Sequence, residues 1–295
     1  MELIVAVILT LNEEIHLERC LSSISETVDK IIVIDSGSSD RTIEIAKRFN
    51  CIIESNDWIN YSKQFNYGIS IAKKHNAEFI LRIDADEYVD FTLNKSIQRL
   101  KHEKSLCAGY YIERYIKFAG RIMRHGGVFP VKVIRLFNAD LGACEEKWMD
   151  EHIIVEGKVG YLAGELIDDS DKPIDWWINK HLWYAERECI DILNSRENKG
   201  SEPDLNHGSN FVKRFIKVKI YNRMPIGLRS LMYWIYRYFI CAGFLDRSQG
   251  FFFHFLQGFW YRTMVDYKLL TIKKFCKENR CHWKQAVVEL YGYKL

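Results

Sequence analysis

The first hundred residues alternate between short apolar runs and stretches with helical periodicity, and this alternation restricts the fold more than any other feature. The apolar runs cover residues 3–9, 30–34, 51–54 and 79–83. The stretches that predict helices cover about residues 13–24, 41–49 and 62–75. Short β-branched runs between helices are typical of buried parallel strands joined by crossovers. We therefore predict an α/β fold with a mostly parallel sheet, whose ligands bind at the carboxyl ends of the strands.

The pattern changes after residue 90. Two further strands are predicted over 108–118 and 131–137, a strand pair around 153–159, and an amphipathic helix from 173 to about 195. We expect a catalytic domain over residues 1–195, a polar linker over 196–210 and a helical region over 211–295.

The composition excludes several classes of protein. With 48% hydrophobic and 27% charged residues, the chain has enough apolar material for a large core and is not intrinsically disordered. We find no run of about 18 uncharged apolar residues and no signal-peptide pattern at the N-terminus, so we expect neither a polytopic membrane protein nor a secreted one. The eight cysteines are scattered, which is typical of reduced packing residues.

Two carboxylates follow the fourth apolar run directly, at Asp84 and Asp86. Acids on alternate residues at a strand end can bind one hard divalent cation and leave its other positions to water and phosphate oxygens. The same pair is also common in solvated acidic loops. Its position after a buried strand favours the metal site.

Polar residues also follow the first two strands. Thr10, Asn12 and Glu13 end the first strand, and Asp35 opens a loop of small residues after the second. Each could be ordinary loop or helix-cap chemistry. Together they would place a hydroxyl, an amide and carboxylates on one sheet edge, where the small residues let a planar base approach and Asp35 can accept a hydrogen bond from it. The glycine-rich loops of Rossmann dehydrogenases and P-loop enzymes are absent from the sequence.

These motifs, in this order and spacing, resemble the family-2 glycosyltransferases of GT-A fold. The shared segments are Thr-Leu-Asn-Glu-Glu at 10–14, Asp-Ser-Gly-Ser-Ser-Asp at 35–40 and Asp-Ala-Asp-Glu at 84–87. The segments 124–130 and 135–137 and the pair Asp150-Glu151 are similar to a bacterial subgroup that includes lipopolysaccharide-core β-glucosyltransferases. This resemblance covers about residues 1–195. The stretch from 243–246 through 256–262 also looks like the C-terminal part of bacterial surface-polysaccharide transferases.

The resemblance implies transfer of a sugar, glucose or a related hexose, from a UDP-sugar, with inversion and with Mg²⁺ or Mn²⁺. It also implies roles for individual residues. Asp86, with Asp84, would hold the metal. The nucleotide-sugar would be bound by Thr10, Asn12, Glu13, Asp35, Lys63, Gln64 and Asp84.

Inversion needs a carboxylate that accepts the proton of the acceptor hydroxyl. Glu151 is our first candidate for this base and Asp150 the second. The resembled subgroup usually shows His-Glu where this chain has Asp150-Glu151, so the chain departs from the pattern at this point. An acidic surface turn would look similar. Four residues are candidates for binding the diphosphate or an anionic acceptor: Arg114, Arg124, His125 and Arg135. Charged side chains that face solvent on a strand are the alternative interpretation. His181 is expected to be a structural histidine.

Residues 211–280 combine basic and aromatic character. They hold fourteen Lys and Arg against three acids, and 18 of the 41 aromatic residues. Apolar aromatic runs flanked by cations are typical of helices lying in an anionic membrane interface. A buried helical subdomain with a basic outer face is the alternative. Nucleic-acid binding is disfavoured, because the aromatics cluster in apolar runs.

The sequence therefore predicts an inverting, metal-dependent transferase that is peripheral to the cytoplasmic face of the bacterial inner membrane. Its acceptor would be a glycolipid, either lipid A-core or a polyprenyl-diphosphate-linked glycan. The alternatives are a sugar-nucleotide nucleotidyltransferase, whose glycine-rich loop is missing, and a non-enzymatic membrane scaffold, which would not need an intact acidic set.

Overall fold

The computed structural model describes residues 3–103, 106–146, 151–197, 225 and 227–293. The chain forms two units. Residues 1–124 and 128–171 make one, which we call the sheet domain, and residues 125–127 and 172–295 make the other, which we call the helical unit.

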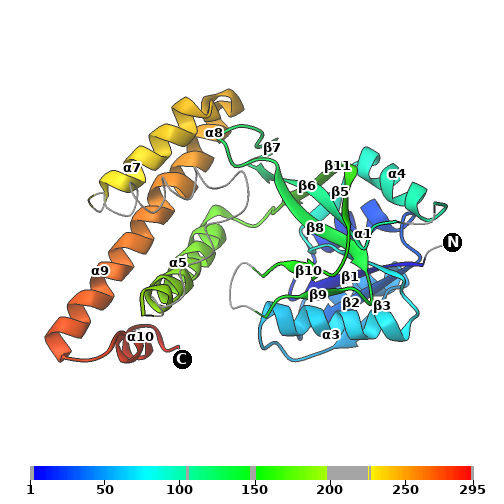
Figure 1. The fold of residues 1–295 in the computed structure, drawn as a ribbon, viewed down its shortest axis with the longest axis horizontal. Helices are drawn as coiled ribbons and strands as arrows, with labels where there is room; N and C mark the ends of the chain where they lie inside the picture. Colours follow the sequence, from blue (N-terminus) through cyan, green and yellow to red (C-terminus); the bar gives the residue numbers. More distant parts are fainter. Residues whose placement is uncertain (1–2, 104–105, 147–150, 198–224, 226, 294–295) are drawn as a thin grey trace. The chain divides into compact units, whose positions relative to one another are not determined.

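The sheet domain is built on a mixed sheet with the strand order β3-β2-β1-β4-β8-β6-β11-β5, and β7 pairs with β6 (Figure 1). The first four strands in this order are parallel, and they are the four predicted from the apolar runs. Their bounds are Ile52–Ser55 (β3), Lys30–Asp35 (β2), Ile4–Thr10 (β1) and Phe79–Arg82 (β4). Beyond β4 the pairing is antiparallel except between β6 and β11.

The remaining strands extend this sheet or pair with each other. Those of the main sheet are β5 (Glu87–Val89), β6 (Gly109–Phe118), β7 (Arg121–Ile122), β8 (Val131–Asn138) and β11 (Val159–Asp169). A separate two-stranded sheet joins β9 (Gly142–Cys144) to β10 (Ile153–Val155). The predicted fold class is thus confirmed.

Alternation along β1 explains how both faces of the sheet are covered. Ile4, Ala6 and Ile8 pack with α1 (Leu17–Ile24), α2 (Thr42–Arg48) and α4 (Phe91–Leu100). Val5 and Val7 pack on the opposite face with α3 (Tyr61–Lys74). A strand buried on both faces is the expected centre of a doubly covered sheet. This packing fixes the strand ends where the polar loops begin.

The helical unit has its own core. Apolar residues of α5 (Ile174–Glu197), α9 (Tyr261–Asn279) and α10 (Trp283–Tyr291) pack together. The helix predicted from 173 to 195 is therefore present, but it belongs to the helical unit. The observed division after Asp171 differs from the predicted domain end at 195, because the apolar face of α5 packs on α9 and α10. Most of the predicted linker, residues 198–210, lies outside the described residues.

A second part of the helical unit is a helical hairpin over residues 228–260. It comprises α7 (Leu228–Ile235), η2 (Tyr236–Ile240), η3 (Gly243–Asp246), α8 (Arg247–His254) and η4 (Phe255–Trp260). Many large apolar side chains of this hairpin are exposed to solvent, among them Met232, Tyr236, Phe239, Ile240, Phe244, Leu245 and Phe252. Among the described helices, none combines the length and the hydrophobicity that crossing a bilayer requires.

Candidate functional site

The carboxyl ends of β1 and β2 are joined by a buried hydrogen bond, 2.8 Å long, from the Thr10 hydroxyl to Asp35. Asp35 also accepts hydrogen bonds from the backbone N–H groups of Gly37 and Ser38 and from the Ser38 hydroxyl. Four donors fill the acceptor positions of a carboxylate. Asp35 therefore shapes the loop, and a hydrogen bond to a nucleobase would have to replace one of these four.

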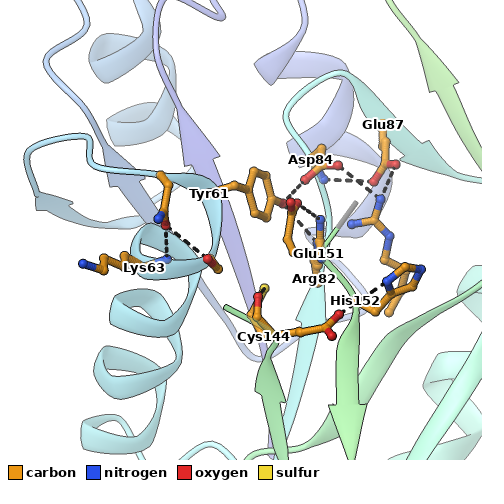
Figure 2. A network of polar contacts seen from close by, with 12 residues as sticks. Tyr61, Lys63, Arg82, Asp84, Glu87, Cys144, Glu151 and His152 are labelled. Carbon is orange, nitrogen blue, oxygen red and sulfur yellow. Dashed lines mark hydrogen bonds and ion pairs between the residues drawn. The ribbon is translucent and has the colours of Figure 1, made fainter. Parts of the chain in front are cut away.

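The other residues predicted around the nucleoside meet at the same loops, with one exception. Asn12 accepts a hydrogen bond from the backbone of Ser39, and the Glu13 N–H donates to the Thr42 hydroxyl. Gln64 is buried and donates to Ser36 in the loop after β2. Lys63 is exposed in the first turn of α3 and points away from the acidic residues in Figure 2.

Asp84 lies two residues beyond β4, in a dense polar cluster (Figure 2). The Tyr61 hydroxyl donates to one of its carboxylate oxygens, and Arg135 donates to the other at 3.1 Å. The fully buried Glu87 accepts from Arg135 at 2.7 Å and from Arg114 at 2.6 Å. Glu87 also accepts from the backbone N–H of Asp84 at 3.0 Å, which closes the loop on itself.

Arg82 connects this cluster to Glu151. Its Nε donates to the Tyr61 hydroxyl at 3.1 Å, and its Nη2 lies 3.4 Å from Oε1 of Glu151. The guanidinium also stacks over the ring of Tyr61, 4.4 Å from its centre. We call the seven residues Tyr61, Arg82, Asp84, Glu87, Arg114, Arg135 and Glu151 the Asp84 network. The residue predicted as the base thus belongs to the same network as the predicted metal ligand.

The charges of the network fix the protonation of its members. Burial alone would raise the pKa of Asp84, but the guanidinium groups of Arg135 and Arg82 hold that pKa well below its usual range. Burial raises the pKa of the Tyr61 hydroxyl well above its ordinary value, so Tyr61 stays a donor. Burial also raises the pKa of Glu87, against the attraction of Arg135 and Arg114. Asp84 is therefore an ionised carboxylate at neutral pH.

Arg135 keeps unused hydrogen-bonding capacity although it is only 5% exposed. Its Nη2 binds Asp84 and Glu87, while its Nε and Nη1 have no hydrogen-bond partner in the described part of the chain. A buried donor without a partner costs free energy unless something else accepts from it. Phosphate oxygens suit a guanidinium donor, which supports the predicted contact of Arg135 with a diphosphate.

The carboxylates of Asp84 and Asp86 are of the chemical type that binds a divalent cation. Asp84 and Asp86 are oxygen donors on one loop, Asp84 is ionised, and both side chains are partly exposed. Within the described residues, no group of three or more His, Cys, Asp or Glu side chains forms a complete metal cage. Two carboxylates would leave the remaining coordination positions to water and to phosphate oxygens of a bound nucleotide.

The structure does not bring every predicted residue into the network. Arg124 forms a bidentate ion pair with Glu165, in which both N–O distances are 2.7 Å. His125 belongs to the helical unit, where its ring donates to Asp246. Asp150, the second candidate for the base, lies outside the described residues. His181 donates through Nδ1 to the carbonyl of Trp177, as expected of a structural histidine.

Sequence reasoning missed three members of the network. Tyr61 and Arg82 carry no motif and become partners of Asp84 and Glu151 only when α3 packs on one face of the sheet. Glu87 could have been found, because it directly follows the two metal candidates in the sequence.

Comparison with known proteins places the chain in a family. The sequence profile described as "Glycosyl transferase family 2" matches residues 5–145, which include both strand-end loops and the Asp84–Glu87 segment. An uncharacterized glycosyltransferase of Rickettsia felis is 32% identical over 204 residues, covering 65% of this chain and 71% of the relative. The chain belongs to glycosyltransferase family 2.

Two further proteins are similar over part or most of their length. The lipopolysaccharide core biosynthesis glycosyltransferase LpsC of Rhizobium meliloti is 26% identical over 61% of this chain and 68% of its own length. The crystal structure of residues 1–349 of S. aureus TarS matches with a TM-score of 0.43 and 12% identity, over 96% of this chain and 93% of TarS. The matches to the glycosyltransferases of Rickettsia typhi and Rickettsia felis span 66% and 71% of the length of those proteins.

Proposed function

We propose that this protein transfers a sugar, glucose or a related hexose, from a UDP-sugar to a glycolipid, with inversion at the anomeric carbon. The observation that carries the proposal is the Asp84 network, in which a candidate base, an ionised carboxylate and a partly unpaired arginine are joined by hydrogen bonds. An inverting transfer needs these three groups: one accepts a proton, one binds the cation and one stabilises the leaving diphosphate.

Glu151 is proposed as the base. In the transfer, the acceptor hydroxyl oxygen forms a bond to the anomeric carbon and its proton passes to the carboxylate of Glu151. The bond from the anomeric carbon to the diphosphate oxygen breaks, and UDP leaves with the electron pair. Arg82 orients Glu151 through their contact of 3.4 Å, and Arg135 has free donors for the oxygens of the leaving group.

Asp84 and Asp86 are proposed to hold Mg²⁺ or Mn²⁺. When bound, the cation would offset the negative charge that develops on the leaving diphosphate. Tyr61 and Arg135 keep the carboxylate of Asp84 ionised and oriented for this role.

The loops after β1 and β2 are proposed to bind the nucleoside. Thr10 and the four hydrogen bonds of Asp35 fix the shape of this surface, and Gly37 has no atom within 4 Å of the position of a Cβ. A flat base can therefore approach the backbone at Gly37.

The helical unit is proposed to hold the enzyme on the cytoplasmic face of the bacterial inner membrane. The exposed aromatic and aliphatic side chains of the hairpin at 228–260 would enter the headgroup layer, and the basic residues of 211–280 would be drawn to anionic lipids. A membrane position agrees with a glycolipid acceptor, either lipid A-core or a polyprenyl-diphosphate-linked glycan. The similarity to LpsC, a lipopolysaccharide core biosynthesis glycosyltransferase, supports lipopolysaccharide or polysaccharide synthesis as the setting.

Detergent-solubilised protein tests the proposal. It should release UDP from a UDP-sugar only when a divalent cation is present, and faster when bacterial glycolipid is added. A nucleotidyltransferase would instead release diphosphate from UTP and a sugar phosphate, and a scaffold would release neither product.

A further inference from the structure

The hairpin at 228–260 departs from regular α-helix at three places. The segments η2 (Tyr236–Ile240) and η4 (Phe255–Trp260) are π-helical, and η3 (Gly243–Asp246) is a 3-10 turn. Ala242 and Arg247 adopt positive φ angles of 56° and 60° without being glycine. π-helical turns and strained backbone of this kind concentrate at functional sites. The irregular segments surround two buried polar side chains, Arg237 and His254.

Both side chains lack hydrogen-bond partners that their burial requires. Arg237 is 3% exposed and His254 is fully buried. The Nε and Nη2 of Arg237 and both ring nitrogens of His254 have no partner among the described residues. No carboxylate in the described part of the chain forms an ion pair with Arg237, although a buried unpaired charge is costly. The Nε and Nη2 of Arg237 can therefore donate hydrogen bonds to a bound group.

Three glycines make room around these two side chains. A Cβ added to Gly126 would lie 2.1 Å from Cε1 of His254, and one added to Gly243 would lie 2.5 Å from Cδ2 of the same ring. Gly258, in η4, lies against the Arg237 side chain. Gly126 is thus required both for its positive φ of 91° and for contact with the ring.

The segment His125–Gly127 is hydrogen-bonded to the hairpin near these two side chains. Its His125 N–H and ring both donate to the buried Asp246, and the Gly126 N–H donates to the carbonyl of Cys241 at 2.9 Å. The chain neighbours of this segment, Arg124 and Val128, belong to the sheet domain. A ligand held here would therefore lie beside a loop that continues directly into that domain.

We propose that Arg237 and His254 form a binding site for a phosphate or diphosphate group, separate from the donor site. The two unpaired nitrogens of Arg237, Nε and Nη2, lie on one edge of the guanidinium, where two parallel N–H bonds match two oxygens of a phosphate. A neutral imidazole adds one N–H donor, and the surrounding aromatic side chains exclude water. The phosphate can come from a lipid headgroup, such as that of a glycolipid, or from a free anion.

The charge balance of the site supports an anion. Burial lowers the pKa of His254 to about 4, with Arg237 and His125 adding to this shift and Asp246 opposing it. His254 is therefore neutral at pH 7, and the charge that needs compensation is that of Arg237. Asp246 is already hydrogen-bonded to His125.

Vesicle binding by the full chain in EDTA tests the site, because the donor site then holds no divalent cation. Two vesicle types are matched in surface potential, one with phosphatidic acid and one with phosphatidylglycerol. The first offers an open phosphomonoester and the second a shielded diester. We expect binding to phosphatidic acid to be about tenfold tighter, with Arg237→Gln removing this preference. The matched control is Arg247→Gln, at an exposed arginine of the same hairpin, which should weaken both bindings equally.

Calorimetry with inorganic diphosphate separates the two sources when EDTA and saturating UDP are present, because UDP then occupies the proposed donor site around Arg135. If diphosphate binds in solution and Arg237→Gln abolishes this binding, the site takes a free anion. If diphosphate does not bind while the lipid preference depends on Arg237, the site takes a lipid headgroup. Both results support the proposal. Asp86→Ala, which removes the proposed metal ligand, should leave both measurements unchanged, so the phosphate site and the donor site are tested separately.

The proposal is overturned if wild-type protein shows neither preference nor binding, or if a folded Arg237→Gln variant keeps either at the wild-type level. Should Arg237→Gln fail to fold by circular dichroism, Arg237→Lys takes its place. Lysine keeps the positive charge but lacks the two parallel N–H donors of arginine. If Arg237→Lys preferred phosphatidic acid vesicles as strongly as wild type does, the proposal would also be overturned.

Discussion

Arg82 and Glu151 meet at 3.4 Å, between the Nη2 of a strand residue and the carboxylate of a residue 69 positions later in the chain. Through the Tyr61 hydroxyl, the same guanidinium is joined to Asp84. The contact ties the proposed base to the proposed metal ligand. A change at one of these residues should therefore alter the reaction.

Replacement of Glu151 by Gln keeps the size of the side chain and removes its ability to accept a proton. We expect turnover to fall by about 10² or more, with the affinity for UDP within about threefold of wild type. Steady-state kinetics and calorimetry measure the two effects. Glu145→Gln, at a nearby acid that pairs with His152, serves as the control and should keep most of the turnover. If Asp150→Asn has the large effect and Glu151→Gln does not, the base is Asp150.

Removal of the Asp86 carboxylate should abolish the dependence of UDP binding on Mn²⁺. Calorimetric titration of UDP with and without Mn²⁺ measures this, and the variant with Mn²⁺ should resemble wild type in EDTA. Asp140→Ala removes an acid with an 87% exposed side chain and should behave as wild type. Unchanged metal-dependent binding in Asp86→Ala would remove Asp86 from the metal site.

Loss of the Tyr61 hydroxyl should weaken the donor site and the fold together. Tyr61→Phe removes a hydrogen bond to Asp84 and leaves Nε of Arg82 without its acceptor. We expect the free energy of unfolding to fall by about 2 kcal/mol and the pKa of Asp84 to rise. Chemical denaturation and the pH dependence of Mn²⁺ binding measure the two changes. Tyr67→Phe on the same helix is the control, and equal effects of the two variants would contradict the role of Tyr61.

The helical unit should lose stability in mild acid because His181 is buried in its neutral form. Burial lowers the pKa of His181 to about 4, and the ring stacks on Trp177 and donates to its carbonyl. The unfolded value is about 6.5, so the stabilisation is complete above that pH and is lost as pH falls towards 4. Thermal melts of wild type and His181→Phe at pH 7 and pH 4.5 test this. Between pH 7 and pH 4.5, the melting temperature of the variant should fall by less than that of wild type. An equal fall in both proteins would contradict the prediction.

Membrane binding should depend on the exposed apolar side chains of the hairpin. Ile240 is 73% exposed, and Ile240→Asp should lower binding to anionic vesicles by about tenfold or more, because a charge replaces a side chain worth roughly 2 kcal/mol on burial. Leu106→Asp provides the matched control in the sheet domain, where Leu106 is 85% exposed. If both variants bind as wild type does, the hairpin is not the membrane contact.

The parallel part of the fold was predictable because local signals and tertiary packing agree there. The runs at 3–9 and 30–34 are apolar on both faces, and they form β1 and β2 within one residue of the predicted bounds. The polar helix α4 was missed, although Asp90 caps it through the N–H of Leu93. The predicted domain end at 195 lies beyond the observed division after Asp171. The reason is that α5 packs on α9, whose residues lie about 80 positions further along the chain.

Part of the candidate site could be predicted from the sequence, because its acids lie at the ends of apolar strands. Asp35, Asp84 and Asp86 follow apolar strands, so their meeting at one sheet edge could be expected. The partners of these acids could not, since Tyr61 lies on a helix and Arg135 within a distant antiparallel strand. The separation of Arg124 from His125 between the two units has no local signal either.

A crystal structure of the protein with UDP and Mn²⁺, in which an anomalous difference map locates the metal, tests the proposed donor site directly. We expect one strong peak within about 2.2 Å of the Asp86 carboxylate, with diphosphate oxygens bound to the metal and facing Arg135. A peak at another place, or UDP bound away from the loops after β1 and β2, would contradict the proposed site.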